Sequence, residues 1–190
     1  MLLTIALLAA SLQTADTVQI EPVAPQVEFQ SPQERLDERL EALAEADETE
    51  AALLVDEILA LWSHSGSDTV SLLMDRGMAA EAAGDAGIAG RMYDHVNRLA
   101  PDYAQGWLAS GRIAMDVEDW SYALETLNTA LTIEPRRFDA YFILGRTLER
   151  ANAPEAALQA YNEALAIYPA FEAALEARNR LETSLAGRSL

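Results

Sequence analysis

Apolar and polar residues recur along the chain with the period of an α-helix, in short segments separated by breaks. Between residues 31 and 186 the sequence is rich in alanine, leucine, glutamate and arginine, which are good helix formers. No long stretch alternates with the two-residue period of a strand. Turn-forming residues interrupt the helical pattern near residues 47–49, 65–67, 84–87, 101, 117–119, 135, 152–154 and 169. The pattern predicts an all-α chain of short helices joined by short turns.

The first helix has a clear start signal at "SPQE", residues 31–34. Ser31 is a good N-cap, a proline follows at the first helical position, and Glu34 completes a capping box. We therefore predict two helices, at about 32–46 and 50–63, that form a hairpin.

A spacing of 34 residues recurs downstream of this hairpin. It relates three prolines, three glycines and three alanines: Pro101, Pro135 and Pro169; Gly77, Gly111 and Gly145; Ala89, Ala123 and Ala157. This period is the signature of a helix–turn–helix solenoid. The glycine and the alanine fit where two helices approach closely, and the proline ends the second helix of each pair because it has no N–H to donate.

On these residues, the units 70–103, 104–137 and 138–171 resemble tetratricopeptide repeats (TPRs). The match is best in "AYFILGRTLERANAPEAALQAYNEALAIYP", residues 140–169. The resemblance implies a right-handed solenoid of three clear repeats that binds other proteins. Unit 70–103 departs most, with Leu73 where an aromatic residue is common and Gly90 inside its second helix. Since interior glycine costs about 1 kcal/mol relative to alanine, we expect this helix to be the least stable of the three.

Two flanking segments complete the expected array. Residues 31–66 form an acidic hairpin that is either a degenerate TPR-like repeat or an N-terminal cap. Residues 172–187 are amphipathic and suit a C-terminal capping helix, which such arrays need to cover their last apolar face. The hairpin followed by three units also resembles exported TPR proteins of alphaproteobacteria, some of which carry a similar Trp-Ser-x-Ser-Gly-Ser junction.

The N-terminus indicates export. Residues 1–15 are mostly apolar or small and carry no charge, which resembles a signal peptide, although no basic residue precedes the apolar run. The run is too short for stable membrane insertion. Residues 16–30 carry two prolines and are predicted to be a disordered linker. A periplasmic location is expected, with a cytoplasmic one as the alternative.

Charge and composition narrow the choice of partners. The net charge is −18, all thirteen basic residues are arginine, and there is no cysteine. Such a chain is repelled by nucleic acid and by anionic membrane surfaces. The absence of cysteine excludes disulfides, thiolate metal sites and a lipid anchor on cysteine. Residues 16–57 hold thirteen acids and two arginines, which makes either a solvated surface or a surface that steers a basic partner.

The stretch "LWSHSGSDTV", residues 61–70, gathers residue types used in catalysis. Ser63, His64 and Asp68 are nearly consecutive, however, whereas a hydrolase triad is assembled by the fold around a nucleophile. Gly66 suits a helix C-terminus and Ser67 an N-cap. The stretch is therefore predicted to join two helices, with a hydrolase at residues 63–68 as a distant alternative. No metal, calcium or phosphate-binding pattern is present, so no cofactor is expected.

Binding is the function that remains. In TPR superhelices the first helix of each unit lines the concave face, and its fifth, ninth and twelfth residues share one side. The candidate groove residues are Met74, Met78, Leu108, Arg112, Met115, Phe142, Arg146 and Glu149. They predict an apolar stripe that holds a peptide or helix of a partner, with two arginines able to bind a carboxylate. The alternative is that these side chains are partly buried, with the arginines paired to Glu81, Glu149 or Asp116.

One known TPR subtype does not fit. Repeats that hold the acidic C-termini of heat-shock chaperones use a lysine and asparagine clamp, and the resemblance places Met74 and Met78 at those positions. The sequence therefore predicts a non-enzymatic protein-interaction module whose partner is a protein or peptide. The main alternative is a structural scaffold that self-associates through Trp120, Tyr122 or an imperfectly capped end.

Overall fold

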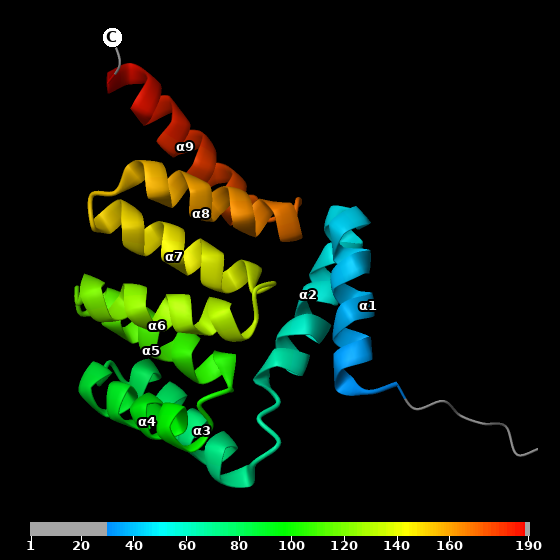
Figure 1. The fold of residues 1–190 in the computed structure, drawn as a ribbon, viewed down its shortest axis with the longest axis vertical. Coiled ribbons are helices and arrows are strands. Elements are labelled where there is room, and N and C mark those ends of the chain that lie inside the picture. Colours follow the sequence, from blue (N-terminus) through cyan, green and yellow to red (C-terminus); the bar gives the residue numbers. More distant parts are fainter. Residues whose placement is uncertain (1–29, 189–190) are drawn as a thin grey trace, which may run out of the picture.

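The computed structural model describes residues 30–188, which form nine α-helices and no strand (Figure 1). The predicted signal peptide and all but the last residue of the predicted linker lie outside the described residues. The helices are α1 (Pro32–Glu45), α2 (Glu48–Ser63), α3 (Asp68–Ala82), α4 (Ala86–Leu99), α5 (Ala104–Asp116), α6 (Trp120–Ile133), α7 (Phe138–Arg150), α8 (Pro154–Ile167) and α9 (Glu172–Arg188).

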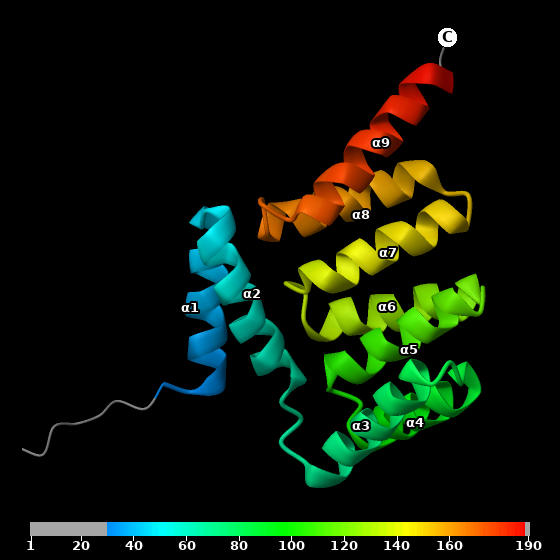
Figure 2. The same ribbon diagram turned by 180° about the vertical axis from the view of Figure 1, so that it is seen from behind.

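Helices α3 to α9 stack in sequence order, each against the next, as Figures 1 and 2 show from opposite sides. The predicted units 70–103, 104–137 and 138–171 correspond to the pairs α3–α4, α5–α6 and α7–α8. The predicted all-α helix–turn–helix solenoid is therefore confirmed.

The periodic glycines lie where the two helices of a pair touch. A β-carbon added at Gly145 would lie 2.5 Å from Cε1 of Tyr161, and one at Gly111 would lie 2.7 Å from Cγ of Leu127. One at Gly77 would overlap the Tyr93 ring in the same way. Only glycine allows the first helix to pack this closely on the large side chain of the second.

The turn within each pair repeats as well. Gly84, Glu118 and Asn152 follow one another at the 34-residue spacing, and all three have left-handed backbones, with φ of 76°, 62° and 59°. This conformation ends the first helix and reverses the chain. Glycine and asparagine adopt it readily, whereas Glu118 does so at a cost.

The first helix begins as the sequence predicts. The Ser31 hydroxyl accepts a hydrogen bond from the Glu34 amide at 3.2 Å, and the Glu34 carboxylate accepts one from the Ser31 amide at 2.7 Å. This is the predicted capping box, with the proline at the first helical position.

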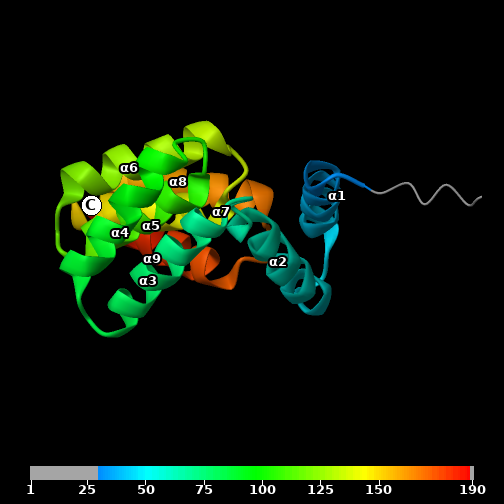
Figure 3. The same ribbon diagram turned by 90° about the horizontal axis from the view of Figure 1, so that it is seen from below.

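The α1–α2 hairpin takes a different place from that of a further repeat. It stands beside the stack (Figure 3), and its main contacts are with α5, α7 and α8 rather than with α3 and α4. Its apolar face forms one buried cluster with Phe138 of α7, and Tyr168 and Phe171 pack against that cluster. The hairpin members of the cluster are Leu36, Leu40, Leu43, Ala51, Ile58 and Trp62.

Polar contacts fix the hairpin along this edge of the stack. Arg136 donates to the Asp37 carboxylate at 2.6 Å, and the Tyr103 hydroxyl donates to the Ser63 carbonyl at 2.6 Å. The buried Arg137 guanidinium lies 4.6 Å from the centre of the Trp62 ring. Tyr103, Arg137 and Phe171 are 34 residues apart, so the hairpin contacts the last residue of each of the three units.

Because the hairpin packs along the edge of the stack, the two ends of the stack are covered differently. Leu72 of α3 is 50% exposed, whereas its counterparts Gly106 and Ala140 are buried. The open face of α3 is therefore left uncovered by the hairpin. At the other end α9 packs on α8 through Ala174, Ala177 and Leu181 and turns the polar Asn179 and Glu182 outward, as a capping helix does.

Candidate partner-binding groove

The apolar stripe predicted for the first-helix face is largely buried. Met74, Leu108 and Met115 are buried, and Phe142 is half-buried with its ring 5.0 Å from the centre of the Phe171 ring. Leu108, for example, belongs to a cluster that contains Leu127 and Leu131 of α6. These side chains point into the stack, so the expected open apolar contact surface is absent from residues 30–188. Met78 alone of the predicted apolar groove residues is well exposed.

The predicted polar residues form a repeated network. Glu81 of α3 accepts hydrogen bonds from the Tyr93 hydroxyl at 2.9 Å and from Arg112 Nη2 of the next unit at 2.7 Å. Two units later, Glu149 accepts from the Tyr161 hydroxyl at 2.5 Å and from Arg180 Nη2 of α9 at 3.0 Å. Each network links the two helices of one pair to the helix that follows, so its role is structural.

The tyrosines of these networks are protected from ionisation. Burial, followed by the hydrogen bond to the glutamate, raises the pKa of Tyr93 and of Tyr161 well above the ordinary range of a phenol. At neutral pH both hydroxyls are therefore donors, as the networks require.

The equivalent network between the middle and third units keeps only its arginine. At the 34-residue spacing, Met115 stands in place of the glutamate and Leu127 in place of the tyrosine, while Arg146 is retained. Arg146 is exposed, and no carboxylate of residues 30–188 lies within ion-pair distance of it. Its guanidinium lies 6.0 Å from the centre of the Phe142 ring.

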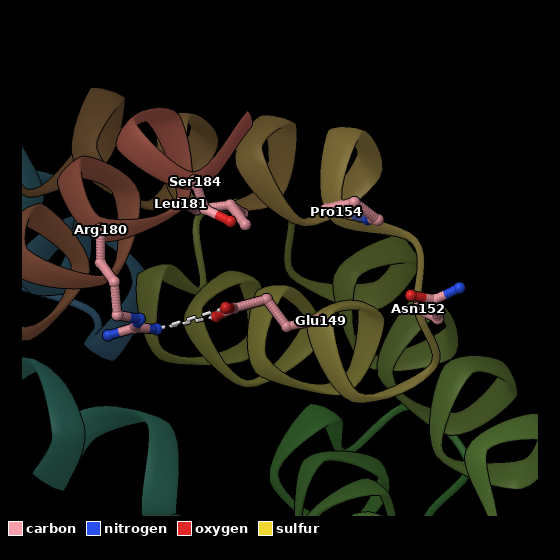
Figure 4. Close-up of a pocket in the computed structure, with 6 residues that line it drawn as sticks. All are labelled: Glu149, Asn152, Pro154, Arg180, Leu181 and Ser184. Atoms are coloured by element: carbon pink, nitrogen blue, oxygen red, sulfur yellow. Dashed lines mark hydrogen bonds and ion pairs between the residues drawn. The ribbon is translucent and has the colours of Figure 1, made fainter. Parts of the chain in front are cut away.

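Arg146 belongs to a basic hollow at the C-terminal end of the stack. We define the basic hollow by its lining residues, Arg146, Glu149, Arg150 and Arg180. A neighbouring hollow shares Glu149 and Arg180 and extends to Asn152, Pro154, Leu181 and Ser184 (Figure 4). In Figure 4, Arg180 of α9 reaches across to Glu149 of α7. Three arginines around one glutamate form a local positive site in a chain of net charge −18.

Two of these three arginines were not predicted as site residues. Arg180 follows Arg146 by 34 residues, so extending the repeat period into residues 172–187 would have found it. Arg150 ends α7, where a basic residue also complements the helix dipole, so its sequence position gave no separate signal.

The stretch at residues 61–70 joins α2 to α3. The Ser67 hydroxyl caps α3 by accepting from the Val70 amide at 3.5 Å. Ser63 donates to the carbonyl of Ala60 at 2.9 Å, and Ser65 to the carbonyl of Ser67 at 3.0 Å. Gly66 has φ of 68°, a left-handed conformation that glycine adopts without strain. The hydroxyls of the joint are thus engaged in local structure, as predicted.

Trp120 and Tyr122, the residues named for self-association, are half-buried. The Tyr122 hydroxyl donates to Oδ1 of Asp94 at 2.8 Å. Burial and then this hydrogen bond raise the pKa of Tyr122 to about 12. Both side chains therefore contribute to the packing of the stack. Within residues 30–188, no helix has the length and apolar character needed to cross a membrane.

Comparisons with known proteins agree with this architecture. The family model described as "Tetratricopeptide repeat" matches residues 108–170. A TPR repeat-containing protein of Rhizobium etli is 32% identical over 158 residues, which cover 83% of this chain and 78% of that protein.

Solved structures of TPR domains have a similar fold. The Sgt2 TPR domain from Aspergillus fumigatus superposes with a TM-score of 0.62 at 16% identity, over 65% of this chain and 83% of that one. The first TPR of Spaghetti (RPAP3), bound to the HSP90 peptide SRMEEVD, superposes with a TM-score of 0.61 at 18% identity, over 63% of this chain and 95% of that one. With the repeat period, the glycine contacts and the stacked helix pairs, these similarities show that the chain belongs to the tetratricopeptide repeat family.

Proposed function

We propose that this protein is a non-enzymatic interaction module whose basic hollow binds a carboxylate-bearing segment of a partner protein. TPR domains are protein-interaction modules, so the class of activity follows from the family. The observation that carries the finer proposal is that Arg146 lacks the glutamate with which its counterparts Arg112 and Arg180 pair.

The proposal follows from comparing the units. Where the twelfth residue of a unit is glutamate, as at Glu81 and Glu149, the arginine of the next helix binds it. Met115 offers Arg146 no such partner. The exposed Arg146 guanidinium lines the basic hollow, so a partner carboxylate can bind it there through two hydrogen bonds. Arg150 adds a second exposed cation beside it.

The fold has a precedent for acidic ligands. One of the similar structures, the first TPR of Spaghetti (RPAP3), holds an HSP90 peptide with the sequence SRMEEVD, which contains consecutive glutamates. In this chain Met74 and Met78 replace the polar clamp of chaperone-binding repeats, so we propose acidic segments of other proteins as ligands.

A titration with succinate tests the proposal and does not require the partner to be identified. We expect the side-chain Nε–Hε NMR signals of Arg146 and Arg150 to shift saturably as this dicarboxylate is added. Arg112, which already pairs with Glu81, should not shift. The exposed Arg76 and Arg98 serve as internal controls, since they lie outside the basic hollow. Equal shifts at Arg76, Arg98 and Arg146 would contradict a specific carboxylate site.

We further propose that the protein acts in the bacterial periplasm. The support is the uncharged, apolar segment at residues 1–15, which resembles a signal peptide. N-terminal sequencing of the mature protein from its host tests this. A mature chain that begins within residues 10–17 is expected, and an intact Met1 in the cytoplasmic fraction would contradict export.

A structural scaffold is a second candidate, favoured by the open face of α3. Leu72 is 50% exposed on the side where a preceding unit would pack, and such a surface is suited to contact with another copy. Light scattering at increasing concentration tests this candidate. Concentration-dependent association that Leu72→Ser removes would support it, and a monomer at high concentration would count against it.

A further inference from the structure

A second hollow lies between α4, α5 and α6, away from the basic hollow. Its lining includes Gly90 from α4, Ile113 and Ala114 from α5, Val117 from the turn after α5, and Tyr122 from α6. We call this site the glycine hollow. Val117 is 56% exposed, so its side chain can be reached from solvent.

The hollow exists because one leucine of the repeat is missing. Leu124 and Leu158 stand 34 and 68 residues after Gly90, so they occupy the same position in the other two units. Leu158 packs in the cluster of Leu181, together with Leu185. Ile113 and Val117 are the counterparts of Leu181 and Leu185 at the first junction. They therefore present a surface that elsewhere receives a leucine side chain.

There is space for a side chain at this place. A β-carbon added at Gly90 would meet no atom closer than Ile113 Cγ2, at 3.9 Å. Gly87, one turn earlier in α4, also lines the hollow and adds no side chain to it. The missing leucine is thus not replaced by other atoms of the described chain, and an apolar group from outside can enter.

The rim of the hollow is acidic. Asp94 and Asp119 line it, and the exposed Asp116 and Glu118 flank Val117 in the same turn. Arg91 is the one basic residue among those that line the hollow. A ligand that carries positive charge beside its apolar group therefore complements this site, and the net charge of −18 favours its approach.

We propose that the glycine hollow is a docking site for a basic partner segment. The segment inserts one leucine-like side chain into the space left at Gly90, over Ile113 and Val117. Its flanking lysine or arginine side chains lie against the acidic rim. This site is independent of the basic hollow around Arg146, and its ligand has the opposite charge.

A pair of synthetic peptides tests the proposal. The first is a nine-residue amidated peptide with one central leucine flanked by arginines, and the second has alanine in place of the leucine. Burial of the larger side chain should make the leucine peptide bind the wild-type protein about tenfold more tightly or better. Equal affinities for the two peptides, measured by fluorescence anisotropy, would overturn the proposal.

Variants of the hollow locate the binding. Gly90→Leu restores the leucine of the other units and should abolish the preference for the leucine peptide, while the melting temperature stays at or above that of the wild type. Val117→Ser should reduce the preference at an exposed position that tolerates the change. A preference that survives both substitutions would overturn the assignment to this hollow.

The acidic rim has its own control. Glu118→Asn removes one charge, and asparagine suits the left-handed backbone at this residue, φ 62°. This variant should weaken both peptides by the same factor and leave their ratio unchanged. An unchanged affinity for both peptides at low salt would overturn the role of the rim.

Discussion

Replacing Gly145 by alanine tests the close packing of α7 against α8. The added β-carbon would lie 2.5 Å, 2.6 Å and 2.9 Å from three atoms of the Tyr161 ring. The ring is fully buried and its hydroxyl is bound to Glu149, so it has no room to move aside. Overpacking costs about 1–3 kcal/mol, and alanine recovers about 1 kcal/mol of helix propensity. Because three ring atoms are involved, we take the upper part of that range and expect a net loss of about 2 kcal/mol.

Gly90→Ala is the matched control, since it makes the same substitution inside a helix where the nearest atom is 3.9 Å from the new β-carbon. It should stabilise the protein by about 1 kcal/mol through helix propensity alone. Thermal unfolding followed by circular dichroism at 222 nm should show Gly145→Ala melting about 4–8 °C below the wild type and Gly90→Ala about 2–4 °C above it. A Gly145→Ala variant that melts at or above the wild-type temperature would refute the packing argument.

Three further predictions rest on named contacts. Tyr93 and Tyr161 have raised pKa values, so the stability that they contribute is fully present below about pH 10, the ordinary phenol value, and is lost as the pH rises above it. Urea unfolding between pH 9 and pH 11 should show this decline, and a constant stability would contradict it. Phe138→Ala should lower the free energy of unfolding by about 3–4 kcal/mol and release the hairpin from the stack. Amide hydrogen exchange should then be faster in α1 and α2 than in α6. Equal acceleration in all three helices would argue against a separately docked hairpin. Ser67→Ala should lower stability by about 1 kcal/mol through loss of the α3 cap. If it instead abolished a measurable hydrolysis of p-nitrophenyl acetate, the joint would have to be reconsidered as a catalytic site.

The helix boundaries and the repeat fold were predictable because their signals are local or periodic. The capping box at Ser31 fixes the start of α1 within one turn of the chain. The 34-residue spacing of Gly77, Gly111 and Gly145 requires a close helix contact in each unit, and the structure has one at each position. Such signals do not depend on how the units are arranged in space.

The place of the hairpin was not predictable, because it depends on contacts between residues far apart in the chain. Trp62 lies with its ring centre 5.5 Å from that of Phe138, and Asp37 pairs with Arg136. The repeat period is compatible with residues 31–66 as one more unit. It does not indicate that this hairpin packs against the edge of the stack. The apolar face of the hairpin packs against the edge of the stack and does not cover α3, so Leu72 of the first unit remains exposed.

The repeat period placed the candidate groove residues on the first helix of each unit, but it left open whether their side chains are exposed or partly buried, and the structure buries Met74, Leu108 and Met115. The exposure of the fifth residue of a first helix depends on how the neighbouring helices pack around it, and the repeat period alone does not specify that packing. In this protein Met74 is buried in a cluster that contains Tyr93 and Ile113, and Leu108 in one that contains Leu127. The missing glutamate beside Arg146, by contrast, is visible as Met115 once Glu81 and Glu149 are known to pair with the next helix.

Quantitative partner capture tests the central claim, that Arg146 and Arg150 bind a partner carboxylate. Wild-type protein, the double variant Arg146→Ser/Arg150→Ser and the control Arg76→Ser/Arg98→Ser would be immobilised and compared by mass spectrometry after exposure to a periplasmic extract. The control removes the same charge from two exposed positions outside the basic hollow. The account predicts that proteins enriched by the wild type are retained by the control and lost by the Arg146 and Arg150 variant. Equal recovery of those proteins by all three would contradict it.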